Sequence, residues 1–585
     1  MKDYDVIVIG GGINGLTTSA YLAKAGLSVG VFEARGQCGA HCDTVELGMP
    51  GFLHNLHATW LATSYSAAME DLDLPGLGFE LRGTDITYAK PFESGRNLLH
   101  AMDVSKTNAN WARASEADAA TQLKALEFNA YNLEEMLGVN RDFWYGPPTE
   151  ATLGRMYKLL DGFLAHQGHS DTSGADLLNM TGFEVLELLF ESEEVKTTTA
   201  SCGWIGGMPP IHRQIGALAA VFLAGIGGPM AVHTSRGGSH ALTHALVKAT
   251  AEAGGEIWTT CPVERIVVED GRAVGIRLTD DALMPGEEIR AKTIVSNVSL
   301  VPTFIGMLGE DVIGADIAAR VQQFNYDEQV LFGVYYNLCD DVEFASAQWD
   351  PGIQRCMMGY LGGETIDDMR RHNMNLVSGV IDDEVMGNWF VPTRADPTQA
   401  PDGCHTAFIW VDVPPLPRRW QGRKISGGLN AWPELAEPMG DVITDRIEQF
   451  APGFKDIVVD RFVMTPLDQV RNNASAIRAN IMGGSVTPDQ FYLNRPVPGI
   501  ITKGASRTFL PGLYLSQSIH PMGASWLATG YLAACEVAED TGCRDQSWWT
   551  HRPWDWFMNH MMDVPMNLGV GAKWLEDEAS GGAGQ

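Results

Sequence analysis

Apolar residues at the start of the chain follow the order strand, helix, strand. Residues 6–9 form a continuous β-branched run, which is typical of a strand buried on both faces of a parallel sheet. Leu16, Ala20, Leu22 and Ala23 give the next segment an apolar helical face, and Gly26 ends it. Residues 27–32 return to a strand pattern. The start of the chain therefore predicts a βαβ unit.

The middle of the chain has a different pattern. Residues 71–207 are mostly helical in character, including 119–137 and 182–194, and predict an inserted region. The charge-free run 215–232 contains Gly225, Gly227, Gly228 and Pro229 and is barely long enough to span a bilayer. We interpret it as a buried helix and turn, which is compatible with the lining of an apolar substrate cavity.

Later segments return to strand character. Residues 263–269 and 273–278 flank Asp270-Gly271, a dipeptide that supplies the positive φ angles of a type I′ hairpin turn. Residues 292–297 predict a buried strand, and 512–518 a strand followed by a helix over 527–538. These segments are expected to complete the first domain. Strand-like runs at 330–338 and 406–413 predict a second domain with a mixed sheet.

The first predicted turn carries a GxGxxG pattern. Gly10 allows the tight turn, Gly12 lets the backbone approach a pyrophosphate, and Gly15 lets the helix pack closely on the strand. The phosphates would lie at the helix N-terminus, where free N–H groups favour negative charge. Glu33 ends the second strand, where a carboxylate would bind the adenosine ribose and disfavour a 2′-phosphate. The unit therefore predicts a dinucleotide site; the alternative is a glycine-rich turn without a ligand.

Charge and cysteine content exclude several classes of function. A net charge of −31 argues against nucleic-acid binding and against electrostatic docking on anionic lipid. Nine scattered cysteines without a CxxC pair favour a reducing compartment. No basic segment precedes the first strand, so we expect no signal peptide and a cytoplasmic protein. There is no second strand–GxGxxG–helix unit, no HExxH or GxSxG motif and no zinc-type cluster, so neither a separate nicotinamide site nor a metal is expected.

The C-terminal part carries a more specific set of motifs. These are Thr465-Pro466-Leu467-Asp468, Asp489-Gln490-Phe491-Tyr492, Arg495-Pro496, Gly512-Leu513-Tyr514-Leu515 and His520-Pro521-Met522-Gly523-Ala524. With the N-terminal motif, they resemble the FAD-dependent phytoene desaturase-like oxidoreductases, including the branch known as phytoene dehydrogenase-related. The resemblance covers residues 5–60, 235–300 and 465–540.

The resemblance implies FAD and a set of contacts for it. It assigns the ADP part to Gly10, Gly12, Gly15 and Glu33, the pyrophosphate region to Arg35, Gly39, Ala40 and His41, the adenine side to the Val263 backbone, and the flavin border to Ser518, Met522, Gly523 and Ala524. The chain departs from the family at Gly39-Ala40-His41, where Gly-Gly-Arg or Gly-Gly-Ala is common. Trp526 stands where the family has a small residue, which argues against a long C40 polyene substrate.

Three histidines are candidates for a base or positioning donor beside the flavin. His54 and His57 are three residues apart and are expected to share a helix face, and His520 lies at the turn under the flavin. The alternative for each is a structural histidine. The C-terminal segment with Trp548, Trp549, Trp554, Phe557 and Met561 predicts core docking, with a lip that dips into lipid as the alternative.

Together these patterns predict an α/β fold, with a discontinuous Rossmann-type FAD-binding domain, a mixed-sheet α+β substrate domain and a helical insertion. The expected segments are 1–70, 231–298 and 465–545 for the FAD-binding domain, 71–230 for the helical insertion, 299–464 for the substrate domain, 546–575 for the apolar segment and 576–585 for a disordered tail.

The expected activity is dehydrogenation of a hydrophobic, isoprenoid or alicyclic substrate by hydride transfer to flavin. Oxygen, a quinone or another carrier would accept the electrons. Two alternatives stay open: a redox-neutral flavin-dependent isomerase, and a flavin-stabilised interaction protein. Peripheral membrane contact is a further open alternative, and the sequence does not define the oligomeric state.

Overall fold

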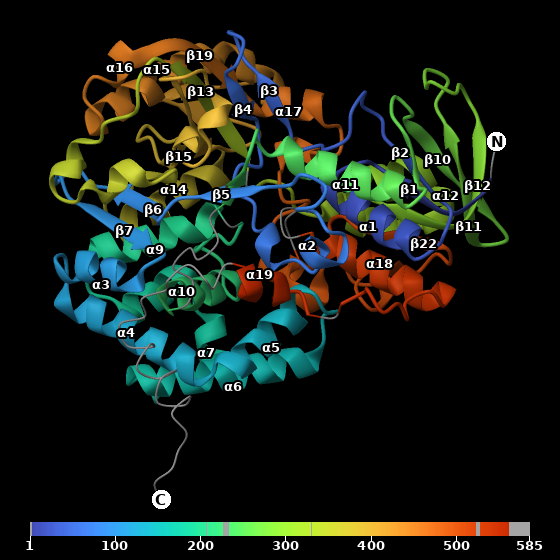
Figure 1. The fold of residues 1–585 in the computed structure, drawn as a ribbon, viewed down its shortest axis with the longest axis horizontal. Coiled ribbons are helices and arrows are strands. Elements are labelled where there is room, and N and C mark those ends of the chain that lie inside the picture. Colours follow the sequence, from blue (N-terminus) through green and yellow to red (C-terminus); the bar gives the residue numbers. More distant parts are fainter. Residues whose placement is uncertain are drawn as a thin grey trace, which may run out of the picture.

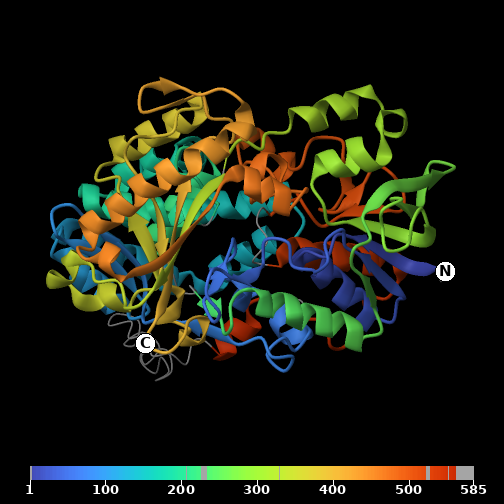
Figure 2. The same ribbon diagram turned by 90° about the horizontal axis from the view of Figure 1, so that it is seen from above.

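Two large sheets and a layer of helices make up the molecule (Figure 1). The computed structural model describes residues 3–205, 207–225, 233–328, 330–521, 527–550 and 552–560. Seen from above, the second sheet, in yellow and orange, lies across the molecule from the sheet beside the N-terminus (Figure 2). The helices from the first half of the chain lie below the second sheet.

The first sheet has a parallel core built from widely separated parts of the chain. In spatial order its strands are β22 (Leu513–Leu515), β12 (Glu288–Ser296), β1 (Tyr4–Ile9), β2 (Val29–Phe32) and β9 (Glu256–Trp258). Val6 and Val8 of β1 belong to the core cluster on one face, and Ile7 and Ile9 to the cluster on the other. The predicted doubly covered strand and the Rossmann-type sheet are confirmed.

Additional strands and helices complete this unit. The edge strands are β20 (Ile501–Lys503) and β21 (Arg507–Thr508), and β11 (Arg272–Leu278) joins β12 to β10 (Val263–Glu269). Asp270 and Gly271 have φ angles of 48° and 72°, which confirms the predicted hairpin turn. One face packs against α1 (Ile13–Lys24), α11 (His240–Glu252) and α18 (Ala528–Thr541). The other packs against η2 (Val301–Leu308), α12 (Glu310–Ile313) and α13 (Ala315–Gln323).

The second sheet is mixed, as predicted. Its strands in spatial order are β19 (Val458–Met464), β13 (Leu331–Leu338), β16 (His405–Asp412), β15 (Gly387–Phe390), β14 (Met358–Leu361), β6 (Ile86–Pro91) and β7 (Asn97–Ala101). The β14–β6 pair is parallel and the other pairs are antiparallel. Phe332 and Val334 pack with residues of α15 (Trp432–Phe450) on one face, while Tyr335 and Phe408 face the large central core.

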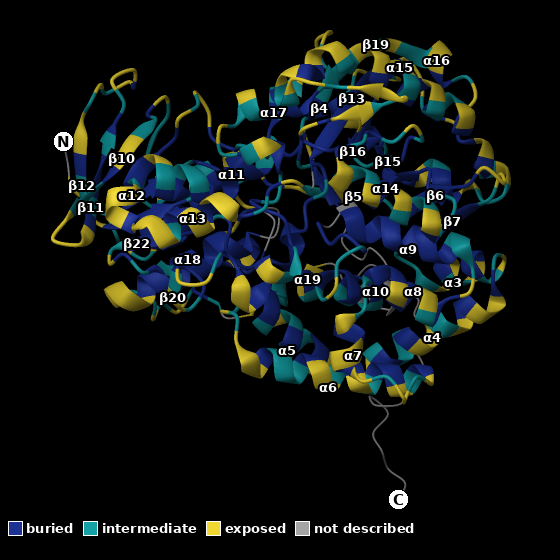
Figure 3. Cartoon of the chain, turned by 180° about the vertical axis from the view of Figure 1, so that it is seen from behind, coloured by how far each residue is buried: buried dark blue, intermediate teal, exposed yellow. Residues whose placement is uncertain are grey.

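The helical layer lies under the second sheet and has its exposed residues on the outer side (Figure 3). Its members are α3 (Val104–Ala112), α4 (Glu116–Tyr131), α5 (Leu133–Trp144), α6 (Glu150–Gln167), α7 (Gly174–Asn179), α8 (Gly182–Leu189), α9 (Glu193–Ile205) and α10 (Ile215–Gly225). Ser115 and Thr149 cap α4 and α6 by accepting hydrogen bonds from backbone N–H groups. The helix predicted in the charge-free run begins at Ile215; residues 226–232 lie outside the described part.

The region expected to be helical also supplies strands. β6 and β7 lie within it and pair with the second sheet, and β5 (Leu81–Gly83) pairs with β8 (His233–Ser235). Both faces of β6 and β7 are buried, so the alternation of polar and apolar residues that marks a half-exposed strand is missing. The predicted segment boundaries themselves stay predictions.

Shorter elements connect these units. They are β3 (Thr44–Glu46), β4 (Leu53–Asn55), η1 (Thr63–Tyr65), α2 (Ala68–Asp71), α14 (Ile366–Ser378), α16 (Phe454–Ile457), α17 (Pro466–Asn472), α19 (Asp555–His560) and the hairpin of β17 (Arg419–Trp420) and β18 (Arg423–Lys424). In the described residues, no helix combines the length and the apolar composition needed to cross a bilayer.

Candidate functional site

The glycine turn between β1 and α1 is tightly packed. Gly10 has a φ of 93°, and a Cβ atom on Gly15 would lie 2.3 Å from the Gly10 carbonyl oxygen, so both positions require glycine. Gly12 is the N-cap of α1 and, as a glycine, supplies no side-chain capping hydrogen bond to the first turn. This helix therefore presents an uncapped N-terminus at the end of β1, which is the geometry of an anion site.

Asn297 stabilises this turn through hydrogen bonds. The sequence alone did not identify it as a site residue. Its side-chain nitrogen lies 3.3 Å from the Gly10 carbonyl oxygen, and its side-chain oxygen accepts a hydrogen bond from Ser516. Asn297 directly follows β12, whose neighbours are β1 and β22. A polar residue at the carboxyl end of a predicted parallel strand is the signal that could have identified it.

Glu33 lies directly after β2, as predicted. One carboxylate oxygen accepts a hydrogen bond from the Gly11 N–H at 2.7 Å, and the other accepts one from the Arg35 N–H at 2.8 Å. The Glu33 carbonyl accepts a bond from the Cys261 N–H, two residues before Val263. Glu33, the glycine turn and the segment leading to β10 therefore meet at one edge of the sheet.

Interactions among its own residues stabilise the loop that follows Glu33. Arg35 forms an ion pair with the buried Asp43 at 2.7 Å and reaches the Ala40 carbonyl oxygen at 3.3 Å. Gly39 has a φ of 119°, and its N–H donates to the Gly11 carbonyl at 2.9 Å. This places Gly39 and Ala40 beside the glycine turn, and a Cβ on Gly12 would lie 3.6 Å from the Ala40 Cβ.

Buried polar atoms without a protein partner gather on the segment that follows β4. His57, Thr59, Thr63 and Ser64 are all buried, and their side-chain polar atoms have no hydrogen-bond partner among the described residues. Buried polar groups are normally hydrogen-bonded, so a run of unpaired ones indicates a place where a polar ligand completes the site. The first residue of this segment, His57, is one of those expected to lie beside the flavin.

His57 and His41 form a pair of neighbouring rings. Their centroids are 4.5 Å apart, and the Ala58 N–H donates to the His41 carbonyl. Burial holds the pKa of His57 well below its usual value, and the neighbouring His41 and Arg35 side chains lower that pKa further. His57 is therefore neutral near pH 7, with one ring nitrogen available as a donor and the other as an acceptor.

His54 does not share a helix face with His57, so that expectation was wrong. His54 is in β4, where residues 53–55 pair with Thr44, Val45 and Glu46 of β3. Its Nε2 lies 2.7 Å from the Asn337 side-chain oxygen on β13. Burial lowers the pKa of His54 to about 4. This histidine connects the β3–β4 pair to the second sheet.

His520 lies in an aromatic enclosure. Its Nε2 donates a hydrogen bond to the Phe143 carbonyl oxygen at 2.7 Å, and its ring meets Phe143 and Tyr492 edge to face, each at 4.8 Å. Burial lowers the pKa of His520 to about 3. Ser518, two residues earlier, is buried with a φ of 64°. Met522, Gly523, Ala524 and Trp526 lie outside the described residues.

Arg495 organises the turn that contains Ser518 and His520. It is buried and donates to the carbonyl oxygens of Ile519 at 3.1 Å, Ser485 at 2.9 Å and Gly483 at 3.1 Å. Within the described part of the chain its hydrogen bonds go to backbone carbonyls rather than to a carboxylate, and burial lowers its pKa to about 10. From the sequence, Arg495 was recognised only as part of a family motif, and no role was predicted for it.

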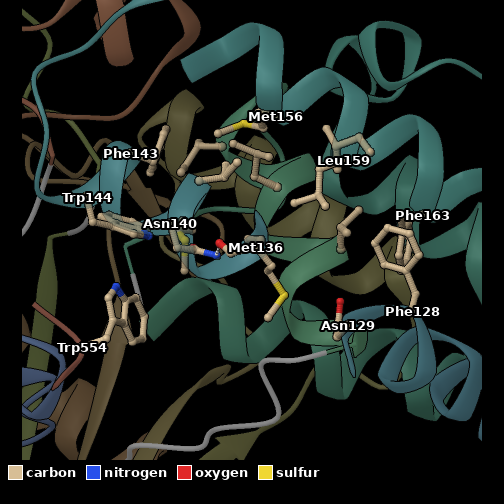
Figure 4. Close-up of a pocket in the computed structure, with 17 residues that line it drawn as sticks. Phe128, Asn129, Met136, Asn140, Phe143, Trp144, Met156, Leu159, Phe163 and Trp554 are labelled. Carbon is tan, nitrogen blue, oxygen red and sulfur yellow. Dashed lines mark hydrogen bonds between the residues drawn. The ribbon is translucent and has the colours of Figure 1, made fainter. Parts of the chain in front are cut away.

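An apolar cavity of about 120 Å³ lies in the helical layer (Figure 4). α4, α5, α6 and α10 supply most of its walls, including Phe128, Met136, Val139, Phe143, Trp144, Met156, Leu160 and Leu218. Phe143 contributes its ring to this wall and also contacts His520. The cavity therefore adjoins the turn at which the flavin is expected.

The described part of the C-terminal segment packs against the rest of the protein, as expected if its apolar residues belong to the core. The Thr550 N–H donates to the buried Asp71 carboxylate at 2.9 Å, and Tyr21 donates to the same carboxylate at 2.7 Å. Trp554 and Phe557 pack on Tyr65, with ring centroids 4.3 and 4.5 Å away. Trp554 also lines the apolar cavity. Met561, Met562 and Met566 lie outside the described residues.

The geometry fits a flavin dinucleotide. The uncapped N-terminus of α1 suits a pyrophosphate, and Glu33 stands at the ribose position of such folds. The unpaired polar atoms of residues 57–64, beginning at His57 beside His41, offer hydrogen-bonding groups for the polar ring system of the same ligand. A bound flavin supplies a hydride acceptor.

Known proteins are similar to this chain over most of its length. Residues 8–73 match the family model of the NAD(P)-binding Rossmann-like domain. A limonene dehydrogenase polypeptide of Castellaniella defragrans is 27% identical over 94% of this chain and 97% of that protein. Phytoene desaturase (neurosporene-forming) of Cereibacter sphaeroides is 23% identical over 79% of this chain and 81% of that protein.

A solved structure supports the fold. Cyclohexylamine oxidase from Brevibacterium oxydans superposes with a TM-score of 0.52 at 16% identity, over 92% of this chain and 100% of that one. The similarity of sequence, the fold and the fit of the nucleotide site agree. The chain is an FAD-dependent oxidoreductase that is similar to the phytoene desaturase-like enzymes.

Proposed function

We propose that this enzyme dehydrogenates a compact hydrophobic substrate, isoprenoid or alicyclic, by hydride transfer to FAD. The observation that carries the proposal is the apolar cavity whose wall residue Phe143 also contacts His520. A substrate in this cavity would be stripped of water and held with one end toward the His520 turn. Such positioning is the main contribution that a protein makes to flavin-dependent dehydrogenation.

The size of the cavity favours a small substrate. Among the relatives, one is named for limonene, a C10 hydrocarbon, and another for phytoene, a C40 polyene. An apolar cavity of roughly 150 Å³ is known to hold benzene. At about 120 Å³, the cavity bounded by the described residues suits a single ring far better than a C40 chain.

His57 is the proposed proton acceptor or positioning donor. It is neutral near pH 7 and its ring nitrogens have no partner among the described residues. Burial lowers the pKa of both histidines, so basicity does not distinguish them; His520 differs because its Nε2 is already engaged with the Phe143 carbonyl oxygen. We therefore assign His520 to positioning, through its bond to the Phe143 carbonyl.

Anaerobic reduction of the bound flavin tests the proposal. Limonene and phytoene are each mixed with the FAD-loaded protein, and the flavin absorbance is followed. We expect bleaching by limonene or another compact alicyclic alkene, and none by phytoene. Bleaching by phytoene alone would contradict the proposed substrate class, and conversion of limonene to an isomer without bleaching would favour the isomerase alternative.

Two variants on α5 test whether the substrate that reduces the flavin binds in the cavity. Val139→Trp fills the cavity from α5 and should abolish bleaching while FAD is retained. Leu133→Trp places the same residue on α5 at an exposed position and should react as the wild type does. Equal bleaching in the two variants would show that the substrate binds elsewhere.

A further inference from the structure

The described lining of the apolar cavity contains a few polar groups, and they are not evenly distributed. Asn140 and the Trp554 indole lie at the end beside Trp144 and Phe143, whereas Asn129 lies at the opposite end, near Phe128 and Phe163 (Figure 4). The end with Trp554 is the one whose wall residue Phe143 contacts His520. Asn129 also has a buried side-chain nitrogen without a partner among the described residues, but only the end beside His520 combines an indole N–H with an amide.

Trp554 brings an unused hydrogen-bond donor to this end. Its Nε1 is buried and has no acceptor within hydrogen-bonding distance among the described residues. The nitrogen edge of the indole is turned toward Asn140 and Trp144 (Figure 4). An unpaired buried donor is energetically unfavourable, so its presence in a mainly apolar wall points to a ligand that supplies an acceptor.

Asn140 can supply the complementary acceptor. Its side-chain nitrogen donates to the Met136 carbonyl oxygen at 2.9 Å, one turn earlier on α5. That bond fixes the orientation of the amide and leaves its carbonyl oxygen with no donor among the described residues. A donor and an acceptor at the same end of an apolar cavity are what a hydroxyl group requires.

Other contacts hold the indole in place independently of any ligand. The Trp554 ring packs 4.3 Å from Tyr65, and the segment that precedes it is tied to Asp71 through the Thr550 N–H. The donor is therefore preorganised, and a ligand would not have to order it on binding.

We infer that the cavity binds a hydrophobic alcohol, whose oxygen accepts a hydrogen bond from Trp554 Nε1 and whose hydroxyl hydrogen is donated to Asn140. The inference rests on the proposed function, because it defines the substrate class of the same cavity. It places the hydroxyl at the end of the cavity that adjoins His520. A pure hydrocarbon leaves both polar groups unpaired and binds more weakly.

A matched pair of ligands tests the inference by binding alone. Limonene and α-terpineol share a carbon skeleton, and the tertiary alcohol has no hydrogen on its carbinol carbon, so it cannot be oxidised there. Titration calorimetry on the FAD-loaded protein under anaerobic conditions should show α-terpineol binding about tenfold more tightly than limonene, as expected for one good hydrogen-bonded group.

Variants locate the source of the preference. Trp554→Phe keeps a ring on Tyr65 but removes the N–H, and Asn140→Leu removes the acceptor; each should abolish the preference for the alcohol. Asn129→Leu, at the other end, should keep it. Equal binding of the two ligands by the wild type, or an unchanged preference in Trp554→Phe, would overturn the inference and leave the proposed function standing. Failure of both ligands to bind would overturn the cavity as the substrate site and the inference with it.

Discussion

The Phe143 carbonyl oxygen accepts a hydrogen bond from His520 Nε2 at 2.7 Å, while the Phe143 ring lines the apolar cavity. One residue thus belongs to the proposed substrate site and to the turn at which the flavin is expected. The two residues are 377 positions apart in the chain. Changes at either one are therefore expected to affect both substrate and cofactor.

Substitutions of two glycines in the nucleotide turn should have different effects on stability and FAD binding. Gly15→Ala would place a Cβ 2.3 Å from the Gly10 carbonyl oxygen, so we expect loss of both stability and FAD. A Cβ on Gly12 meets Asn297 at 3.0 Å, which a small shift relieves; Gly12→Val should fold but exclude the pyrophosphate. FAD content after gel filtration and the unfolding temperature distinguish the two. Gly36→Ala, with no atom within 4 Å of the added Cβ, is the control.

Arg495 should prove necessary for FAD retention. Arg495→Met leaves the carbonyl groups of Gly483 and Ile519 without their donor and removes one of the two donors to Ser485, so we expect a loss of several kcal/mol of stability, on the order of 1–3 kcal/mol per unpaired group. Arg495→Lys keeps the charge without the planar geometry and should recover only part of it. Thermal unfolding and FAD release measure the effect. The exposed Arg471→Met should be neutral, and wild-type stability in Arg495→Met would show that the network is dispensable.

His57 should affect catalysis more than cofactor binding. His57→Ala removes the unpartnered imidazole, and we expect retained FAD with roughly 10²-fold slower flavin reduction by substrate, the usual scale for acid–base help. His54→Ala, which loses a bond to Asn337, is the comparison and should react within a few-fold of the wild type. Stopped-flow reduction across pH provides the measurement. Unchanged rates in both variants would remove the histidine assignments.

Acid stability should depend on His520. In the folded chain its pKa is about 3, against 6.5 for the free group, so the unfolded state binds the additional proton between these values. Its contribution to stability is therefore complete above pH 6.5 and is lost as the pH falls toward 3. Between pH 7 and pH 5, the wild type should lose about 2 kcal/mol more unfolding free energy than His520→Gln, which keeps a donor for Phe143 but does not titrate.

Urea denaturation at the two pH values measures this difference. His560→Gln, at an exposed position on α19, should leave the pH dependence of the wild type unchanged. If His520→Gln loses as much stability on acidification as the wild type does, other groups carry the effect.

The sequence predicted those features of the fold that depend on residues close together in the chain. The turn at Asp270-Gly271 requires positive φ angles, and the doubly buried β1 requires a continuous β-branched run, so both were recognisable. β7 was not recognised, because both of its faces are buried and it carries a buried His100. The helical pattern over 119–137 was correct in type, but the chain breaks into α4 and α5 at Asn132.

The candidate site was predictable in part. Glycine turns and a terminal carboxylate have a fixed spacing, which is why Gly10, Gly15 and Glu33 stand where they were expected. The partners of His54 and His520 come from β13 and α5, far away in the sequence, and no local pattern encodes them. The cavity likewise depends on how four helices and Trp554 pack together.

The parallel core has a consequence for the synthesis of the chain. β1 leaves the ribosome first, but β22, at Leu513–Leu515, follows near the end, and β12 needs both neighbours. At about 5–20 residues per second, translation takes roughly 25–100 s to pass from β1 to β22. During that time the unfinished sheet presents apolar strands with free edges, which can pair with other nascent chains. The sheet that carries the nucleotide turn is therefore complete only after β22 has been synthesised, and FAD loading is expected to be a late event.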